Sequence, residues 1–535
     1  MATAAYHRVE TEKSIPWAVK AFPYVLAVYI AISSLWGVGN ADIVDTDAAR
    51  HAMNGVFIYD LVRTGNLFHP IDYAQQYYGH LPALSMPYHP PLFPAVEAVF
   101  FALFGVKLLT ARLVVALSAG TCIILLYHLI ERTLGNRLIA MCVSATIVSL
   151  STSLWVARDV MLEFPAMALM LAAVHCLHEW EGDFSIKSAL GFAFFASAAF
   201  WTKQHAVLVG GIPPLVALLT GRWRLLFRKP ALVALVLFAA AVGAYIFLSK
   251  QFHNAGIHAA ATSASDLGWI AKATLPSYFV WIKEDLAGIP GVFAVCSIVV
   301  YALTLRKHRP KPFKLTMYWA WVISTAIVLA DLGSTNNRYL FFVFPATLAI
   351  GYAWLFQGCA RLWGERIGER VALGFALVWF VSGFFVQQEI LRGPGAAAAA
   401  VVQGQPARIL YAGEADGNFI FSVRVLDPKM QVTVIPAGKL PRTTFQPADL
   451  EAFCRQYGIN WLILENTPIQ HSWSNLQEST PAFLRLDRTI PLESTRFRWR
   501  TGDIRIFRVV GLPEAPGGVL KLPVWKLGGD IAVQL

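Results

Sequence analysis

The residues most suited to chemistry in this chain are acidic and basic side chains at the ends of long apolar segments. Ten of them recur at such ends, although they are far apart in the sequence: Asp45, Asp47, Arg50, His89, Arg158, Asp159, Glu163, Lys203, His205 and Arg338. A carboxylate takes a proton from an incoming hydroxyl or amine, and cations bind and stabilise phosphate. If these residues share one membrane face, they suit a reaction on a phosphate-linked donor.

The apolar segments that position these residues are long enough to cross a membrane. The 535-residue chain is 56% hydrophobic and only 14% charged, whereas soluble domains carry about 25% charged residues. Its mean hydropathy is +0.52, and runs of about 18–20 apolar residues span a bilayer. We therefore predict a polytopic α-helical membrane protein with about eleven transmembrane helices. They are expected at residues 22–38, 109–130, 138–155, 162–178, 188–202, 206–220, 230–249, 289–305, 316–332, 338–358 and 371–391.

The direction of the helices follows from Lys and Arg, which concentrate in cytoplasmic loops. These residues gather in alternate connections, among them 132–137, 222–229, 306–314 and 361–370. The pattern predicts a cytoplasmic N-terminus and, after an odd number of spans, a C-terminal segment outside. It also explains the net charge of +11 without nucleic acid. We expect the inner (plasma) membrane of a bacterium, with the C-terminal domain periplasmic or extracellular.

This topology places the ten polar residues at the outer face. Ionisable groups at membrane depth are costly and usually line a cavity or pair with one another. Structural alternatives exist for several of them. Asp45 and Asp47 could cap a helix, Arg158 and Glu163 could form an ion pair, and Lys203 could snorkel to the interface. Their collective position at one face favours chemistry.

Two regions outside the membrane complete the predicted organisation. The transmembrane domain covers residues 1–392, and its first external loop, 39–108, contains apolar stretches at 51–65 and 90–105. Both have helical spacing but are too short or too polar to span, so we expect interfacial amphipathic helices.

The C-terminal part differs in character from the rest. An Ala-rich linker, 393–407, leads to residues 408–535, where predicted strands and helices alternate. This alternation indicates a small α/β domain with a largely parallel sheet. The six cysteines show no metal spacing, and no nucleotide-binding motif is present.

Several short motifs, in order, resemble the GT-C superfamily of polyprenyl-phosphate-sugar glycosyltransferases. The resemblance is strongest to the branch of protein O-mannosyltransferases, lipid A aminoarabinose transferases and rhizobial lipopolysaccharide galacturonosyltransferases. It covers about residues 20–390. The motifs that carry it are VDTDAARHAMNGVFIYDLVRTGN (44–66), YHPPLFPAVEAVFFALFG (88–105), Arg112, ARDVMLEFPAMAL (157–169), FWTKQHA (200–206) and NRYLFFVFPATLAI (337–350).

The resemblance implies roles for some of these residues. The family's first-loop aspartate is the catalytic base, and the spacing Asp-x-x-Arg matches it to Asp47, with Asp45 as the alternative. Glu163 matches a second acid that positions the acceptor or a basic residue. His89 stands where the aminoarabinose branch has Lys, so Lys203 and Arg338 are better candidates for binding phosphate.

The expected substrate-binding residues also include Arg50, His89, Arg158, Asp159 and His205. The predicted partners are a polyprenyl-phosphate-sugar donor, membrane lipids and an acceptor, which is lipid A or lipopolysaccharide, another envelope glycan, a protein or a small lipid. Direct inverting displacement requires no cofactor and no metal, although an aspartate pair could hold a divalent ion. A lipid or glycan flippase and a non-catalytic scaffold are the alternatives.

Overall fold

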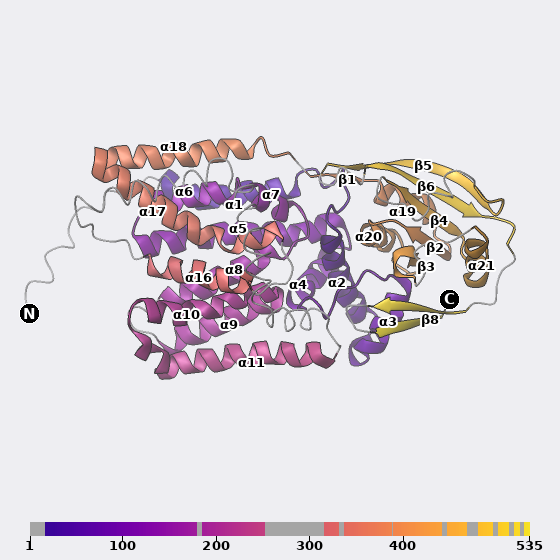
Figure 1. Ribbon diagram of the computed structural model, residues 1–535, viewed down its shortest axis with the longest axis horizontal. Coiled ribbons are helices and arrows are strands. Elements are labelled where there is room, and N and C mark those ends of the chain that lie inside the picture. Colours follow the sequence, from indigo (N-terminus) through magenta and orange to yellow (C-terminus); the bar gives the residue numbers. More distant parts are fainter. Residues whose placement is uncertain are drawn as a thin grey trace, which may run out of the picture.

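The computed structural model describes residues 17–178, 185–251, 315–330, 336–387, 389–440, 447–467, 480–495, 501–512, 518–524 and 529–534. Figure 1 shows a bundle of roughly parallel helices at one end of the molecule and a sheet with its helices at the other. Helices of the first loop lie between these two parts.

The bundle consists of apolar helices. It comprises α1 (Trp17–Leu35), α5 (Leu108–Leu134), α6 (Arg137–Ile147), α7 (Ser151–Arg158), α8 (Glu163–His178), α9 (Ile186–Thr202), α10 (Leu208–Leu219), α11 (Lys229–Gln251), α16 (Thr316–Ala330), α17 (Phe344–Trp363) and α18 (Glu365–Gly383). Within the described residues, α1, α5 and α11 are long and apolar enough to cross a membrane, and the bent pair α6–α7 makes four if it counts as one span. Helices α8, α9, α10 and α16 are also apolar but shorter. The predicted helix 289–305 lies outside the described residues.

One predicted straight helix is broken. Residues 138–155 form α6 and α7, which are bent by 64°. The hydroxyls of Thr146 and Ser149 bond back to the carbonyls of Cys142 and Ala145 at 2.8 and 3.0 Å. Such bonds compete with the helical ladder and bend helices. The last predicted helix, 371–391, is also displaced, since α18 begins at Glu365 directly after Gly364 and ends at Gly383.

The first loop forms α2 (Thr46–Arg63), a short 3-10 turn η1 (Asn66–Phe68), α3 (Pro70–His80) and α4 (Leu92–Phe104). The sequence predicted two helices here, and α3 is additional. Helix α2 begins earlier than expected because Asp45 caps it: its Oδ1 accepts the backbone N–H of Asp47 at 2.8 Å. Substituting such a cap by Ala typically costs about 1 kcal/mol.

The C-terminal elements are β1 (Leu391–Arg392), α19 (Pro394–Val401), β2 (Ala407–Ala412), α20 (Asp416–Leu426), β3 (Val432–Pro436), η7 (Ala437–Lys439), α21 (Pro447–Tyr457), β4 (Trp461–Asn466), β5 (Leu484–Ser494), β6 (Gly502–Val509), β7 (Val519–Val524) and β8 (Gly529–Gln534). The main sheet has the order β1-β5-β6-β4-β2-β3, and β7 and β8 form a separate hairpin. The prediction of a largely parallel sheet is wrong: β3, β2 and β4 are parallel, but β6, β5 and β1 add antiparallel pairs.

The stretch 393–407 is not an extended connection. It contains α19, which packs against α20, and β1 just before it pairs with β5. Tyr78 of α3 is buried in the same hydrophobic cluster as Leu410, Ile435 and Leu462 of the sheet. The first loop and the C-terminal part therefore share a core, which fixes α2 and α3 against the sheet domain.

Candidate active site

Four charged residues from distant parts of the chain meet at helix ends. Asp47 lies in the first turn of α2, Glu163 opens α8, and Lys203 follows the last residue of α9. Arg338 lies in η6 (Asn337–Phe342), a 3-10 segment just before α17. The carboxylates near helix N-termini and the lysine at a C-terminus complement the helix dipoles, so the local folds favour these charges where they stand.

The four side chains form one continuous ion-pair chain. Arg338 donates to Asp47 at 2.7 Å, and its Nε lies 3.7 Å from Glu163. Lys203 in turn donates to the same Glu163 oxygen at 2.5 Å. The Asp47 side chain is 32% exposed, whereas Arg338, Lys203 and Glu163 are 9%, 4% and 0% exposed. Asp47 is thus the accessible end of a buried network.

Tyr339 organises the cations of this network. Its ring centroid lies 5.6 Å from the Lys203 ammonium and 5.5 Å from the Arg338 guanidinium. The ring of His205, from η3 (Gln204–Val207), stacks on it at 4.3 Å. Neither ring nitrogen of His205 has a hydrogen-bond partner in the described part of the chain. His205 therefore lies next to the cations of the network, on the ring of Tyr339.

Asp45 and Asp159 shape the loop that carries Asp47. The Asp45 side chain is used as the α2 cap, and its backbone N–H donates to Asp159 at 2.8 Å. Asp159 is buried and also accepts the N–H of Val160 at 3.0 Å. Burial raises the pKa of Asp159 to about 7, against the lowering effect of Arg112 and with a further raising effect of Asp45. Asp45 Oδ1 is thus engaged in the helix cap, whereas the Asp47 carboxylate pairs with Arg338.

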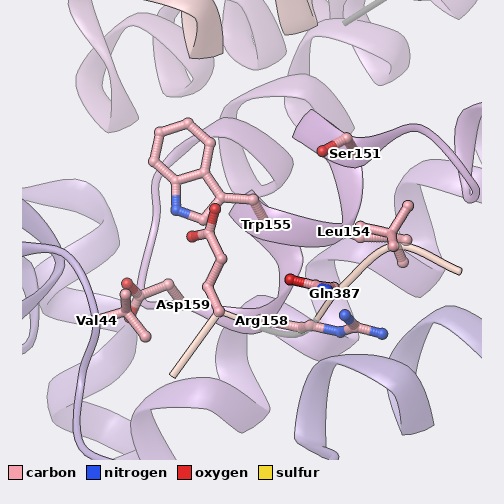
Figure 2. A pocket seen from close by; sticks show the side chains of 9 residues that line it. Val44, Ser151, Leu154, Trp155, Arg158, Asp159 and Gln387 are labelled. Atoms are coloured by element: carbon pink, nitrogen blue, oxygen red, sulfur yellow. The ribbon is translucent and has the colours of Figure 1, made fainter. Parts of the chain in front are cut away.

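Arg158 points away from the network. Figure 2 shows Asp159 directed toward Val44 and Arg158 toward Gln387, on opposite sides of a small cavity. The guanidinium of Arg158 donates to the hydroxyl and carbonyl of Ser33 at 3.1 and 3.3 Å. The structure thus does not pair Arg158 with Glu163: Arg158 binds Ser33 and lines this cavity together with Asp159. The cavity measures about 30 Å³, enough for a water molecule but too small for a sugar.

A histidine pair flanks Asp47 on the other side. His89 lies edge-to-face with His51 of α2, with ring centroids 4.6 Å apart. Burial works to raise the pKa of the Asp47 carboxyl, but Arg338, His51 and His89 outweigh it and hold that pKa well below its usual range. Asp47 is therefore ionised at neutral pH.

Arg50 connects this site to the C-terminal part of the chain. It lies one turn after Asp47 on α2, with its guanidinium 3.8 Å from the Asp47 carboxylate. On its other side the guanidinium lies 3.5 Å from Asp416, the first residue of α20. Among the described residues, no group of three or more His, Cys, Asp or Glu is arranged to hold a metal ion.

The sequence reasoning missed three residues of this site. Tyr339 directly follows Arg338, and His51 lies one helical turn after Asp47. Both positions follow from a residue already chosen, through chain adjacency or the helical repeat. Asp416 carried no such signal, because its place beside Arg50 depends on how the sheet domain docks.

The comparisons with known proteins agree with this architecture. The model of the dolichyl-phosphate-mannose-protein mannosyltransferase family matches residues 88–247. No curated protein matches the sequence itself. Among solved structures, ArnT from Cupriavidus metallidurans, bound to undecaprenyl phosphate, matches at 15% identity and a TM-score of 0.56. The match covers 92% of this chain and 99% of that one.

The chain has the fold of the GT-C superfamily. The archaeal oligosaccharyltransferase AglB from Archaeoglobus fulgidus, in complex with an inhibitory peptide and a dolichol-phosphate, matches at 11% identity and a TM-score of 0.51, over 84% of this chain and 70% of its own. The mycobacterial arabinofuranosyltransferase AftD matches at 12% identity and a TM-score of 0.51. This match covers 94% of this chain and 40% of AftD. Because the ArnT match covers 92% of this chain, the shared fold extends from the bundle into the C-terminal part.

Proposed function

We propose that this GT-C chain transfers a sugar from a polyprenyl-phosphate donor to a hydroxyl or amine of an acceptor. The observation that carries the proposal is the ion-pair chain Asp47–Arg338–Glu163–Lys203, in which the accessible Asp47 carboxylate contacts the buried Arg338 and the buried Glu163 links Arg338 to Lys203. The lipid phosphates bound by ArnT and AglB support a donor of this class. The acceptor is a lipid, a glycan or a protein of the cell envelope.

In the proposed reaction the acceptor oxygen or nitrogen attacks the anomeric carbon of the donor. Asp47 takes the proton of the attacking group while the new bond forms. The bond from the anomeric carbon to the phosphate oxygen breaks, and the polyprenyl phosphate leaves with that electron pair. Lys203 and Arg338 stabilise the departing phosphate. A single displacement of this kind inverts the anomeric configuration.

The low pKa of Asp47 requires an activation step, since a strongly paired carboxylate is a weak base. The Arg338 guanidinium is shared between Asp47 and Glu163. A donor phosphodiester carries one negative charge, as a carboxylate does, and the phosphate gains a second one as it departs; its two free oxygens offer bidentate acceptors to an arginine. When Arg338 turns to the phosphate, Asp47 loses its closest cation and becomes more basic. Donor binding thus prepares the base for the acceptor.

The buried Glu163 acts in this scheme as a positioning residue. Its Oε1 lies between the Lys203 ammonium and the Arg338 guanidinium, and its Oε2 has no hydrogen-bond partner in the described part of the chain. A completely buried carboxylate cannot reach an acceptor. Glu163 can instead hold the positive charges of Lys203 and Arg338 close together, so that the phosphate binds to a preformed pair of cations.

The membrane arrangement belongs to the same proposal. We take the chain to cross a bacterial inner membrane about eleven times, with its N-terminus in the cytoplasm. Asp47 and the sheet domain then lie on the outer side. A donor in the outer leaflet reaches the cations, and the acceptor approaches from the side on which Asp47 is exposed.

The test is Asp47→Asn, expressed in cells that lack the gene. The amide keeps the shape of the side chain but cannot take a proton, so we expect the sugar-modified envelope component to be absent by mass spectrometry. Undecaprenyl phosphate should still bind the purified variant in detergent. The matched control is Asp72→Asn, an exposed acid in the first turn of α3, which should leave the modified component at the wild-type level.

Full transfer by Asp47→Asn would exclude Asp47 as the base. A wild-type gene whose loss changes no sugar of any envelope glycan, lipid or protein would instead favour a transporter or a scaffold.

A further inference from the structure

Arg50 lies between two carboxylates that belong to different parts of the chain. Its guanidinium is 3.8 Å from Asp47 and 3.5 Å from Asp416. Both distances exceed those of a hydrogen-bonded ion pair, for which about 2.7–2.9 Å is usual. The guanidinium therefore closes on neither carboxylate, and its position reflects a balance between them.

The backbone of the sheet domain holds Asp416 in place. Just before α20, the N–H groups of Glu414 and Ala415 donate to the buried Glu465 carboxylate at 3.0 and 2.9 Å. Glu465 also accepts the hydroxyl of Tyr411. Asp416 itself accepts the N–H of Gly417 at 2.7 Å. The carboxylate beside Arg50 is thus fixed by the strand ends β2 and β4, independently of the membrane bundle.

Helix α20 is pressed against α2 at this point. A Cβ added at Gly417 would lie 3.3 Å from the Cβ of Ala49, closer than most real contacts. The side-chain amide of Asn418 donates to the carbonyl of Ile43, just before α2. Further along, Arg424 forms a buried bidentate pair with Asp60. The two helices are therefore joined on both sides of the Arg50–Asp416 contact, which gives that contact a fixed geometry.

We propose that Asp416 is a positioning residue of the active site, which holds the Arg50 guanidinium away from Asp47. The sheet domain thereby contributes a side chain to catalysis. The proposal rests on the proposed function, in which Asp47 is the base. When Arg338 turns to the donor phosphate, Arg50 is the remaining arginine beside Asp47. Without Asp416, Arg50 closes on Asp47 and blocks the oxygen that must accept the proton.

The inference predicts a specific pattern for Asp416→Asn. Transfer should fall about tenfold, part of the ~10²–10⁴-fold that a general base contributes. The Kd for undecaprenyl phosphate should not change, because Arg338 and Lys203 are untouched. Transfer is measured as the sugar-modified envelope component in cells lacking the gene, at equal protein levels. Asp416→Glu, which keeps the charge, should restore most of the transfer.

A double-mutant cycle separates this role from a structural one. If Asp416 acts through Arg50, the double variant Asp416→Asn/Arg50→Gln transfers no less than Arg50→Gln alone. The matched control is Arg63→Gln, because Arg63 contacts the same domain through the Pro428 carbonyl at 3.2 Å but is far along α2 from Asp47. It should leave transfer unchanged at equal protein levels.

The outcomes distinguish the two proposals. An equal loss from Asp416→Asn with and without Arg50, or no loss at all, overturns the role of Asp416 and leaves Asp47 as the base. A loss accompanied by a lower Tm that Asp416→Glu fails to restore also overturns it, since the domain contact would then be structural. Full transfer by Asp47→Asn overturns both.

Discussion

Arg338 donates a 2.7 Å hydrogen bond to Asp47, although 291 residues separate them in the chain. The same guanidinium lies 3.7 Å from Glu163, which pairs with Lys203. Asp47, which follows α1, is thus hydrogen-bonded to Arg338, which precedes α17. The proposed site forms only when the first loop, α8, α9 and η6 are packed together. The proposed activity therefore depends on the tertiary fold.

Replacing Arg338 should weaken phosphate binding and remove the link between donor binding and the activation of Asp47. In Arg338→Gln we expect at least a tenfold weaker Kd for undecaprenyl phosphate, because one charge-assisted contact is typically worth about 1.5–3 kcal/mol. Transfer should fall with it. Native mass spectrometry or a fluorescence titration of the purified protein measures the Kd.

The control for this experiment is Arg158→Gln. Arg158 is another arginine at the same end of the bundle, but its guanidinium binds Ser33. The Kd of Arg158→Gln for undecaprenyl phosphate should equal that of the wild type. If both variants weaken binding equally, the phosphate responds to general positive charge and Arg338 has no special place.

Asp45 should prove to be structural where Asp47 is chemical. Asp45→Ala removes the α2 cap and should cost about 1 kcal/mol of stability, seen as a lower Tm in detergent. Asp45→Ser retains an oxygen that can accept the Asp47 N–H, so both Tm and transfer should stay near the wild type. An inactive Asp45→Ser with an unchanged Tm would make Asp45 a second catalytic carboxylate.

The sequence alone predicted the residues of this network better than their contacts. The predicted topology placed Asp47, Glu163, Lys203 and Arg338 at one membrane face, because every second connection between helices lies on the same side of the membrane. It also grouped Arg158, whose guanidinium the structure directs to Ser33. Loop sidedness fixes a membrane level, but the direction of a side chain depends on the rotation of its helix.

The structural features that the sequence did not predict depend on contacts that hydropathy and local sequence patterns do not show. The bend between α6 and α7 occurs where the hydroxyls of Thr146 and Ser149 bond to carbonyls one turn earlier, and the apolar residues around it leave no sign of it in the hydropathy. The antiparallel pairing of β6 with β4 joins strands that are not consecutive in the chain, whereas β5 and β6 are consecutive antiparallel strands. The position of Asp416 depends on the docking of two domains, which no local pattern encodes.

Asp159 should make stability depend on pH. Its pKa is raised to about 7 in the folded protein, against about 3.9 when unfolded. Between these values the unfolded chain loses the proton and the folded protein retains it. Stability therefore falls as pH rises from about 4 to 7, by up to about 1.4 kcal/mol per pH unit, and is constant above that window.

The variant Asp159→Asn cannot ionise and isolates this effect. The amide oxygen still accepts the Asp45 N–H, while the contact with Val160 is lost, so a constant penalty is expected at every pH. The Tm of the variant minus that of the wild type should increase from pH 5 to 7. A difference that is the same at all pH values would show that Asp159 titrates normally.

The buried pair of Arg424 and Asp60 should hold the sheet domain on the first loop. Arg424 donates to both oxygens of Asp60, at 2.9 and 2.5 Å, and the Tyr77 hydroxyl donates to the same carboxylate at 3.2 Å. Both charged side chains are buried. Arg424→Met leaves the Asp60 charge without its partner, which typically costs about 3–5 kcal/mol. We expect a lower Tm and faster proteolysis near residues 393–407, where the domain begins.

The double variant Asp60→Asn/Arg424→Met tests whether the uncompensated charge is the cause. Removing both charges avoids the desolvation penalty, so the double variant should be more stable than Arg424→Met alone and should resist proteolysis at 393–407. Because α2 carries both Asp60 and Asp47, transfer should recover together with stability. If the double variant is no more stable than Arg424→Met, the arginine acts through packing, and the charge of Asp60 is compensated elsewhere, for instance by Arg63 at 3.4 Å.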